Sequence, residues 1–452
     1  MFDQTYSPDN LRRITEIENR RGKNESLEFF PSVGAATDHL KRCISDAKRF
    51  RATHRSPYNA REQAQFDRLR EAREHARDKR DDELLKCLTG VSERISRPDF
   101  RLKIQKRDGP KGKPVYVVTK GSAECYYAIK QISRNISRIY KVKQSNKDRV
   151  ISQLCDHLND GFPYHILKID VQNFYESIDH HDLIEKLRSD QLLSMTSIRM
   201  IEHLLWDYAN LASTPSCGLP RGVGISAYLA ELYMREFDIR VSSHPEVMYY
   251  ARYVDDIVVL FSPTKASVIN NYKKIIVDEL NRKKLSLNIN KTFESPSVKT
   301  NWHFTYLGYK FKYRNDTNCK ILLSDERFDK YTSRLRASFV RYNRQRSKNS
   351  KKAYRLLIKR IQYLTSNTQL INNKRNAFVG IYFSSPNLSD LSQLDALDGR
   401  LQGYIGQLTH STSLQRTLAN YSFKKGYEER IFRRFHRPGE FAEITRAWKY
   451  DQ

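Results

Sequence analysis

The sequence predicts an α+β fold, because segments with strand-like alternation are separated by longer segments with helical spacing. Residues 100–117 and 249–261 each predict two short strands around a tight reversal, rich in apolar and β-branched residues. Residues 181–213 and the basic region from about 324 onward have helical patterns. With 452 residues the chain is too long for one ordinary hydrophobic core, so we expect several subdomains.

The charge of the chain indicates a polyanionic partner. Lys and Arg number 80 against 52 Asp and Glu, which gives a formal net charge of +28 and a pI near 9.7. A surplus of this size favours nucleic acid over a membrane surface. The alternative is an excess of Lys that only keeps the protein in solution. We expect no membrane association, since no stretch approaches the ~20 apolar residues that a span requires.

The cysteines predict a reducing compartment. The six cysteines are scattered without a C-x-x-C pair, which argues against a zinc site and against a disulfide framework. The first ten residues, MFDQTYSPDN, have neither the basic nor the apolar region of an export signal. We therefore expect a cytoplasmic protein.

The first part of the chain is predicted to be a helical, basic extension over residues 1–97. It is polar and strongly charged with little apolar face, so an exposed, solvated helix is the simpler interpretation. A hairpin with a cationic, glycine-bearing connection follows. Its first strand is indicated by Phe100, Leu102 and Ile104, which alternate with polar residues before a D-G turn signal.

The middle of the chain combines strands with glycine-bearing loops. The segment YHILKIDVQNFYESID predicts a strand that ends near Asp170 and turns into a helix. The segment CGLPRGVGISAYLAELYMREFD predicts a glycine-rich loop that opens a helix. The segment FTYLGYKFKY, residues 304–313, is predicted as a strand. Beyond it, the helical region interleaves cations with tyrosine and phenylalanine.

Two adjacent aspartates within the apolar segment YYARYVDDIVVLF are the main indication of chemistry. Burying Asp255 and Asp256 costs several kcal/mol unless a positive group receives them. Mg²⁺ prefers carboxylate oxygens, and two such ions about 3.5–4 Å apart hold the attacking and leaving oxygens of a phosphoryl transfer. With Asp170 from a neighbouring strand, three carboxylates would form such a site. The alternatives are a solvated turn for the pair and a helix N-cap for Asp170.

This hypothesis sets a geometric condition. Asp170 must lie beside the reversal at residues 255–256, and a lysine ammonium must not fill the space between them. An arrangement that fails on either point removes the basis for a metal site.

Five motifs, in this order along the chain, resemble the palm motifs of reverse transcriptases: KIDVQNFYESID, GLPRGVGISAYLAELYM, RYVDDIVVLFS, LSLNINKT and FTYLGYKF. The resemblance covers residues 98–315. It is to the prokaryotic branch, which comprises group II intron enzymes, retrons and defence-associated reverse transcriptases. The segments ENRRGKNESLEFFPSV and GIYFSSPNLSDLSQLDALDGRL look similar to extensions of the defence-associated enzymes, in particular the first subunit of the type 3 systems.

The resemblance implies a right-hand polymerase with fingers, palm and thumb. The fingers would comprise residues 98–165, and the palm with its antiparallel sheet residues 166–315. Helices around residues 181–215 would belong to the fingers. The helical thumb and C-terminal region would comprise residues 316–452, and the N-terminal helical extension residues 1–97.

The same resemblance implies roles at the catalytic centre. Asp170 and Asp255 match the two metal ligands, with Asp256 as the supporting third carboxylate of a site for two Mg²⁺ or Mn²⁺ ions. Tyr175 stands at the position of the steric gate that favours deoxynucleotides, the alternative being a core aromatic residue. Lys291 matches a lysine near the departing pyrophosphate, where it would act as a general acid. The alternative for Lys291 is an exposed lysine after a helix.

Further positions would contact nucleotide and primer. Arg221 replaces the glutamine that most relatives have in this loop, and its guanidinium suits phosphate. Gly222 would allow the backbone to approach the nucleotide closely. Lys113 and Arg149 are expected at the triphosphate. Leu307 and Gly308 are expected at the primer grip.

These roles imply an RNA-directed DNA polymerase that adds dNTPs to a primer and copies a noncoding RNA in antiviral defence. Its partners would be the RNA template, the DNA product and either a companion reverse transcriptase subunit or further copies of the chain. Two alternatives stay open, a retron or group II intron-like enzyme and an RNA-binding palm-fold scaffold with weak or no catalysis. The clustered acids favour the enzyme, because a scaffold has no need of them in a polyanion groove.

Overall fold

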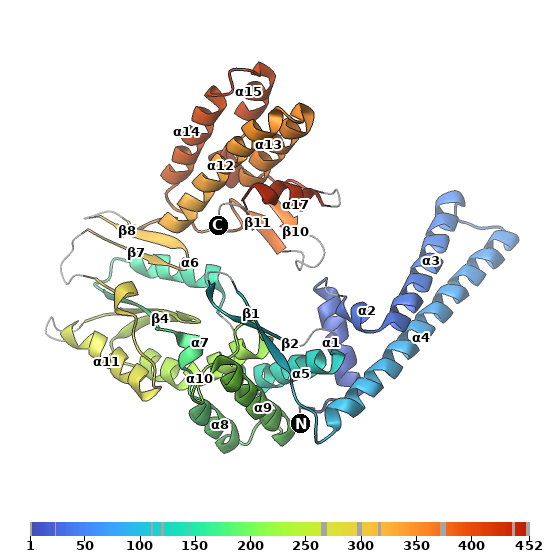
Figure 1. Ribbon diagram of the computed structural model, residues 1–452, viewed down its shortest axis with the longest axis horizontal. Coiled ribbons are helices and arrows are strands. Elements are labelled where there is room, and N and C mark those ends of the chain that lie inside the picture. Colours follow the sequence, from blue (N-terminus) through green and yellow to red (C-terminus); the bar gives the residue numbers. More distant parts are fainter. Residues whose placement is uncertain are drawn as a thin grey trace. The chain divides into compact units, whose positions relative to one another are not determined.

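The computed structural model of the chain forms two compact units, each assembled from separate stretches of sequence (Figure 1). The first unit comprises Met1–Gln144, Gln172–Phe237 and Arg282–Leu285, and the second Ser145–Val171, Asp238–Asn281 and Ser286–Gln452. The structure describes residues 2–22, 24–109, 112–118, 122–143, 145–263, 269–295, 301–314, 318–370, 377–435 and 439–448.

The first unit is mainly helical. Its helices are α1 (Pro8–Arg20), α2 (Glu25–Phe29), α3 (Pro31–Thr53), α4 (Ala60–Ser96), α5 (Ala123–Ile139), α7 (Phe174–Ser177), α8 (His180–Ser189), α9 (Met195–Ala212) and most of α10 (Gly224–Ser242). Strands β1 (Ile104–Arg107) and β2 (Val115–Val118) pair antiparallel. This pairing confirms the hairpin that the alternation within residues 100–117 predicts.

Local signals fix where the long helices begin. Helix α4 starts with a capping box, in which the Asn59 side chain accepts a hydrogen bond from the Glu62 amide and the Glu62 carboxylate accepts one from the Asn59 amide. Helices α3 and α4 then lie side by side as a hairpin (Figure 1). The helical prediction for the N-terminal extension is therefore confirmed.

A four-stranded antiparallel sheet forms one part of the second unit. Its strands, in spatial order, are β4 (Val247–Tyr253), β5 (Asp256–Phe261), β3 (His165–Asp170) and β6 (Phe293–Glu294). Every residue of β3 is buried, and β5 is buried from Ile257 to Phe261. Central strands that are covered on both faces have largely apolar rather than alternating sequences, as IVVLF does, whereas HILKI is interrupted by Lys168.

The rest of the second unit adds a three-stranded sheet, a strand pair and a helical region. The strands are β7 (Trp302–Tyr306), β8 (Tyr309–Tyr313), β9 (Lys320–Leu323), β10 (Asn367–Leu370) and β11 (Ala377–Gly380). The helices are α6 (Lys147–Leu158), α11 (Ile269–Arg282), the 3₁₀-helix η3 (Ile289–Lys291), α12 (Asp325–Arg346), α13 (Ser350–Leu364), α14 (Ser392–Gly406), α15 (Thr412–Ala419), α16 (Phe423–Glu428), α17 (Glu440–Thr445) and the 3₁₀-helix η4 (Arg446–Trp448). Leucines of α12, α13 and α14 share one apolar core, which includes Leu335, Leu357 and Leu397.

Two secondary-structure predictions were wrong in part. Residues 304–313 form two strands rather than one, because the chain reverses at Leu307 and Gly308, whose φ angles are +48° and +77°. Positive φ at both central residues is the pattern of a type I′ hairpin turn. The C-terminal region is also not wholly helical, because β10 and β11 pair within it. Strands of only four residues leave too short a pattern to distinguish from a helix.

The sequence predicts no membrane span and no disulfide framework, and the described residues bear on both predictions. Within that part of the chain, no helix is both long enough and apolar enough to cross a membrane. All six cysteines are free thiols. The scattered spacing of the cysteines predicted this lack of pairing.

Candidate active site

The ends of two neighbouring strands bring three carboxylates together in the second unit. Asp170 is the last residue of β3 and lies directly opposite Asp256, the first residue of β5. The intervening Asp255 is tied to the same place, because the Val171 amide donates a hydrogen bond to its carbonyl oxygen at 3.0 Å. Asp170 is only 6 % exposed. The first part of the geometric condition, that Asp170 lies beside the reversal, is met.

The reversal between β4 and β5 is tight and strained. Tyr253 pairs with Asp256, so only Val254 and Asp255 connect the two strands. The φ angle of Val254 is +62°, in the left-handed region that a β-branched residue rarely adopts. Such conformations cost on the order of 1–3 kcal/mol and persist only where the surroundings enforce them.

A buried arginine enforces this turn. The Arg252 guanidinium donates to the Val254 carbonyl oxygen at 3.1 Å. The same group makes two hydrogen bonds of 2.7 Å to the two carboxylate oxygens of Asp238 on α10. Tyr250 also donates to Asp238, at 2.5 Å, and burial raises the pKa of this tyrosine well above its usual value. The Arg252–Asp238 pair therefore anchors the turn that carries Asp255 to a helix.

Electrostatics distinguish Asp255 from its neighbours. Burial raises the pKa of the Asp255 carboxyl, and the nearby charges of Asp256 and Asp170 raise it further. The positive charge of Lys291 lowers the pKa of Asp255, but this is the smallest of the influences on that carboxyl. A carboxylate whose charge is disfavoured by burial and by like charges is one that a divalent cation would stabilise.

Two lysine ammonium groups contact the other carboxylates, so the second part of the geometric condition is not met as the side chains stand, and a metal site at this centre requires Lys291 to leave Asp170. Lys291 Nζ lies 3.1 Å from Asp170 Oδ2, and Lys168 Nζ lies 3.0 Å from Asp256 Oδ1. Hydrogen bonding to Asp170 raises the pKa of Lys291. The Lys291 side chain is 62 % exposed, whereas that of Lys168 is 7 % exposed. A long, exposed side chain can leave its partner at little cost, whereas the buried Lys168 is a fixed counter-charge.

Sequence reasoning missed four residues that hold the carboxylates in place. Asn288 donates to Asp170 Oδ1 from its side chain and to the Asp170 carbonyl oxygen from its amide, each at 2.9 Å. Lys168 could have been found, because residues two apart on a strand share a face and this lysine interrupts an apolar strand. The pairing of Arg252 with Asp238 has no local signal, since it depends on how α10 packs.

A cleft of about 580 Å³ opens over this centre (Figure 1 shows the surrounding elements). Its lining joins Asp170, Asp256 and Lys291 to the turn at Leu307 and Gly308. The φ angle of Gly308, +77°, favours glycine, and a Cβ atom there would displace the Arg327 guanidinium, which would lie 2.5 Å away. The structure thus places the two residues expected at the primer grip beside the carboxylates.

Other expected site residues lie in the first unit. The Arg221 guanidinium contacts the Glu176 carboxylate at 2.9 Å and lies 5.9 Å from the centre of the Tyr175 ring. The Tyr116 amide of β2 donates to the Arg221 carbonyl oxygen at 2.7 Å. A Cβ atom on Gly222, whose φ is +94°, would meet the Tyr116 carbonyl oxygen at 2.7 Å. The loop that contains Arg221 therefore packs tightly on the β1–β2 hairpin.

The two cations expected at the triphosphate are both exposed. Lys113 lies in the connection between β1 and β2, in the first unit. Arg149 lies in the first turn of α6, in the second unit, and it is not among the residues that line the cleft. Their roles remain predictions.

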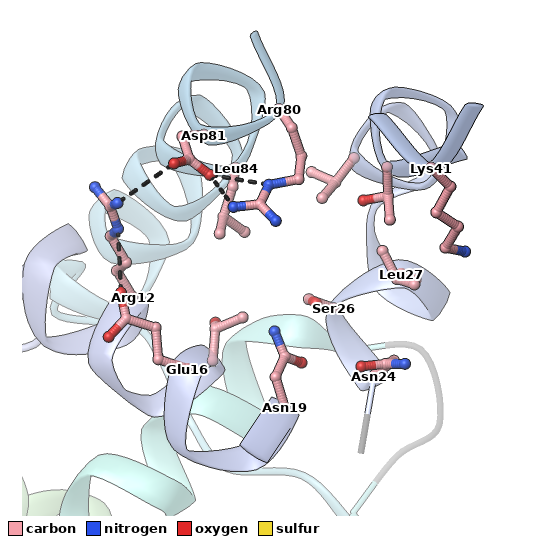
Figure 2. Close-up of a pocket in the computed structure, with 13 residues that line it drawn as sticks. Arg12, Glu16, Asn19, Asn24, Ser26, Leu27, Lys41, Arg80, Asp81 and Leu84 are labelled. Atoms are coloured by element: carbon pink, nitrogen blue, oxygen red, sulfur yellow. Dashed lines mark hydrogen bonds and ion pairs between the residues drawn. The ribbon is translucent and has the colours of Figure 1, made fainter. Parts of the chain in front are cut away.

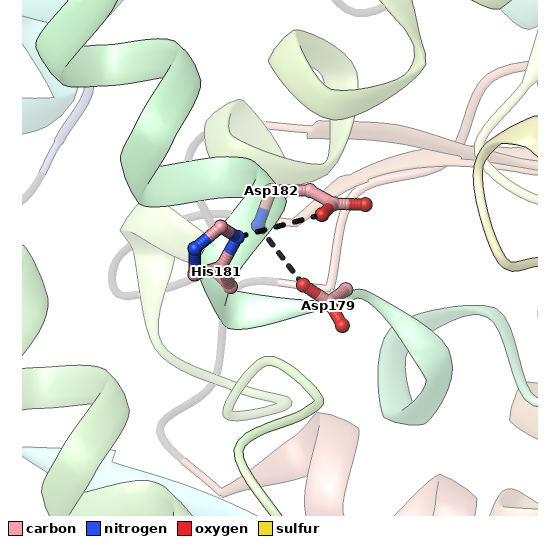
Figure 3. A group of neighbouring side chains, drawn as sticks. All are labelled: Asp179, His181 and Asp182. Carbon is pink, nitrogen blue, oxygen red and sulfur yellow. Dashed lines mark hydrogen bonds and ion pairs between the residues drawn. The ribbon is translucent and has the colours of Figure 1, made fainter.

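A further group of possible metal ligands has a structural explanation (Figure 3). Asp179, His181 and Asp182 place ligand atoms within 4.8 Å of one another in the first unit. Asp179 is the N-cap of α8, and its carboxylate accepts a hydrogen bond from the Asp182 amide. Lys284 contacts Asp179 at 3.1 Å and Asp182 at 2.8 Å. Helix capping and this lysine account for the cluster.

A comparison with known protein families identifies a domain. Residues 120–311 match the sequence model of the family described as "Reverse transcriptase (RNA-dependent DNA polymerase)". Two similar solved structures are telomerases, each with a TM-score of 0.36. The apo enzyme from Candida tropicalis, truncated from its C-terminal domain, is 15% identical over 58% of this chain and 71% of that one. The Candida albicans enzyme in complex with the TWJ fragment of telomeric RNA is 11% identical over 79% of this chain and 62% of that one.

The family match indicates the class of activity. The similarity to the telomerases is too low in identity and TM-score to indicate a function. The comparison with curated proteins finds no match. The fold is that of a right-hand polymerase, of mixed helix and strand. Residues 120–311 form a reverse transcriptase domain, which makes the protein an RNA-directed DNA polymerase, a nucleotidyltransferase.

Proposed function

We propose that the protein extends a primer with dNTPs on an RNA template at the centre formed by Asp170, Asp255 and Asp256. The observation that carries this assignment is the cross-strand pair of Asp170 and Asp256, which both line an open cleft, with the half-buried Asp255 between them along the chain. Three carboxylates at one point suit hard divalent cations, Mg²⁺ or Mn²⁺. When bound, two such ions activate the attacking primer hydroxyl and stabilise the leaving pyrophosphate.

The residues around this centre divide the remaining work. Asn288 fixes Oδ1 of Asp170 at 2.9 Å, while Oδ2 is contacted by Lys291 at 3.1 Å. Lys291, protonated and on an exposed side chain, would leave Asp170 and give a proton to the departing pyrophosphate. The turn at Leu307 and Gly308 would hold the primer backbone at the edge of the cleft.

The residues assigned to nucleotide choice follow the family resemblance. Tyr175 would act as the steric gate, with its ring held beside the Arg221 guanidinium. Gly222 would let the backbone approach the nucleotide. We assign Lys113 and Arg149 to the triphosphate because both are exposed cations. In the same scheme, residues 98–165 are fingers, 166–315 palm and 316–452 thumb.

The biological setting is a further part of the proposal. The resemblance to defence-associated enzymes supports antiviral defence with a noncoding RNA as template and a companion reverse transcriptase subunit as partner. The free cysteines fit a cytoplasmic location. Sequencing the RNA that copurifies with the chain, together with its DNA product, tests this setting. A structured intron RNA or a retron RNA in its place would identify a different branch of the family.

One observation favours a second candidate, a palm-fold scaffold without catalysis. Lys291 on Asp170 and Lys168 on Asp256 supply counter-charge to two carboxylates without any metal ion. Extension of a DNA primer on an RNA template with dNTPs and Mg²⁺ separates the two functions. The parent protein should extend the primer, and the Asp255→Ala, Asp256→Ala variant should not. Equal extension by both, or by neither, would leave the scaffold as the better account.

A further inference from the structure

The hairpin of α3 and α4 carries an uneven distribution of charge that the catalytic site does not use. Over residues 31–97 the chain has 16 Lys and Arg against 11 Asp and Glu. Residues 31–47 contain two of each sign, and residues 71–97 contain seven of each. The entire surplus therefore lies in residues 48–70, the hairpin tip, which has seven cations against two acids. An excess that served only to keep the hairpin in solution would have no reason to gather at one end.

The cations of the hairpin tip all face solvent. Each is exposed, and they are Lys48, Arg49, Arg51, Arg55, Arg61, Arg68 and Arg70. The two acids of the tip are engaged within their own helix. Glu62 completes the capping box, and Asp67 accepts hydrogen bonds of 3.1 Å from Gln63. Arg49 and Arg70 pair with Asp46 and Glu74, which lie just outside the tip, at 3.9 and 3.3 Å. The seven cations still outnumber the two acids of the tip, which therefore presents a positive surface.

The hairpin tip is also preorganised. Phe50 is buried and stacks on His54, with ring centres 4.2 Å apart, and on Phe66, with centres 5.8 Å apart. Tyr58 packs against Phe66 at 5.4 Å, and the Arg51 guanidinium lies 5.2 Å from the centre of the Phe66 ring. A small aromatic core of this kind holds the ends of the two helices together, so the cations are displayed by a fixed scaffold.

The base of the hairpin is anchored to the rest of the first unit by ion pairs (Figure 2). Arg12 of α1 lies 3.7 Å from Asp81 of α4 and 3.5 Å from Glu16. These groups line a pocket of about 220 Å³ among α1–α4. At the base of the hairpin, cations form ion pairs with acids of the same unit, whereas at the tip the cations outnumber the acids. We infer that the two ends of the hairpin have different roles.

We propose that the hairpin tip binds the phosphate backbone of RNA. Closely spaced cations on a rigid surface release counterions from a polyanion when they bind it, and the tip has the charge density and exposure for this. The cations of the tip lie on an exposed surface, where phosphate groups can reach them, so we expect recognition of backbone rather than sequence. The choice of RNA over DNA rests on the proposed RNA-directed activity of residues 120–311. The binding of phosphate rests only on the charge and exposure of the tip.

The test measures binding of the full chain to a short RNA hairpin and to a DNA hairpin of the same sequence, by fluorescence anisotropy. Salt is varied between about 50 and 200 mM, because each lost phosphate contact reduces the slope of log K against log [salt] by about 0.7–0.9. The tip variant carries Lys48→Gln, Arg61→Gln and Arg68→Gln. The control carries Arg77→Gln, Lys79→Gln and Lys86→Gln, three exposed cations of the balanced segment. Both variants lose the same charge from the same hairpin.

We expect the tip variant to bind RNA about tenfold more weakly and with a slope smaller by about 2, whereas the control stays within about twofold of the parent. Equal losses in both variants would mean that only net charge matters, and no loss in the tip variant would mean that the tip is free of RNA; either overturns the proposal. Binding to DNA alone overturns it as well.

Activity provides an independent readout. On a short primer already annealed to its template, the tip variant should extend as fast as the parent, because the tip acts on RNA outside the catalytic cleft. If the parent protein binds RNA through the tip but extends no primer, the proposed polymerase function is wrong and the proposed RNA-binding role of the tip is retained.

Discussion

Asp170 and Asp256 lie directly opposite each other across β3 and β5, one at the end of its strand and the other at the beginning. Like charges in such a pair destabilise an antiparallel sheet. Each of the two is supported by a lysine, whereas Asp255 is half-buried and partial burial raises its pKa. The three carboxylates therefore differ in what their removal does to the fold, and this difference can be measured.

The Asp255→Asn variant should be more stable than the parent at pH 7. The pKa of Asp255 is raised above its unfolded value of 3.8, so its ionisation weakens the fold. This penalty is absent below pH 3.8, grows as pH rises and is complete above the folded pKa. The gain in Tm of the variant should therefore increase between about pH 4 and pH 7. A variant less stable than the parent, or a gain independent of pH, contradicts the assignment.

The Asp256→Asn variant should be less stable, in contrast. It leaves the ammonium of Lys168, which is 7 % exposed, without its carboxylate partner. Breaking a fully buried ion pair costs about 3–5 kcal/mol; since the Asp256 side chain is 28 % exposed, we expect about 1–2 kcal/mol. The double variant with Lys168→Met should recover most of this loss. Urea denaturation of the four proteins gives the coupling free energy, and a value near zero would show that the pair is not formed.

The Arg252→Lys variant should lower catalysis more than stability. Lysine cannot keep both hydrogen bonds to Asp238 and the third to Val254, so the strained turn would relax and misplace Asp255. A misplacement of about 1 Å can cost on the order of 10² in rate. We expect kcat to fall at least tenfold and the Mg²⁺ concentration for half-maximal activity to rise. The control is Arg240→Lys, at an exposed arginine that pairs with Glu279. If both variants behave alike, Arg252 has no positioning role.

The Tyr175→Ala variant tests the steric gate. Removing the ring should raise incorporation of ribonucleotides relative to deoxynucleotides by tenfold or more, which corresponds to about 1.4 kcal/mol of lost discrimination. The neighbouring Phe174 is 2 % exposed, so Phe174→Ala should lower Tm by creating a cavity and leave the nucleotide preference unchanged. An unchanged preference in Tyr175→Ala would favour the alternative, a packing role.

The Arg221→Gln variant tests why arginine stands in this loop. Arg221 is bound to Glu176 at 2.9 Å, and both side chains are about one third exposed, so the pair should contribute no more than about 1 kcal/mol. We expect Arg221→Gln and Glu176→Gln to lower stability by similar small amounts, and the double variant to lower it no further. Additive losses would show that the two side chains do not stabilise each other, and the ion pair would not explain the arginine.

Much of the centre could be predicted from sequence, because its signals are local. The apolar segments around Asp255 and Asp256 and the strand that ends at Asp170 predict both the hairpin and its neighbour. What could not be predicted depends on pairing between distant elements. Lys168 reaches Asp256 only through the register of β3 and β5, and Asp238 meets Arg252 only because α10 packs beside β4.

The turn at Leu307 and Gly308 shows a different limit. Leucine is an unusual residue for positive φ, so the segment gave no turn signal and predicted a continuous strand. The structure places both residues at the cleft, as expected for a primer grip, but in a turn. The resemblance thus pointed to residues that line the cleft, whereas the local pattern misjudged their backbone, and their role at the primer stays a prediction.

The most direct test of the central claim is the rate of a single dNTP addition in Mg²⁺ by the Asp255→Asn variant, which is expected to fold at least as well as the parent. The control is Asp207→Asn, at another carboxyl whose pKa burial raises but which lies in α9. If the three carboxylates jointly hold the catalytic ions, Asp255→Asn should slow addition by a factor on the order of 10²–10³ or more, while the control stays near the parent rate. Addition at the parent rate by a folded Asp255→Asn protein would contradict the account.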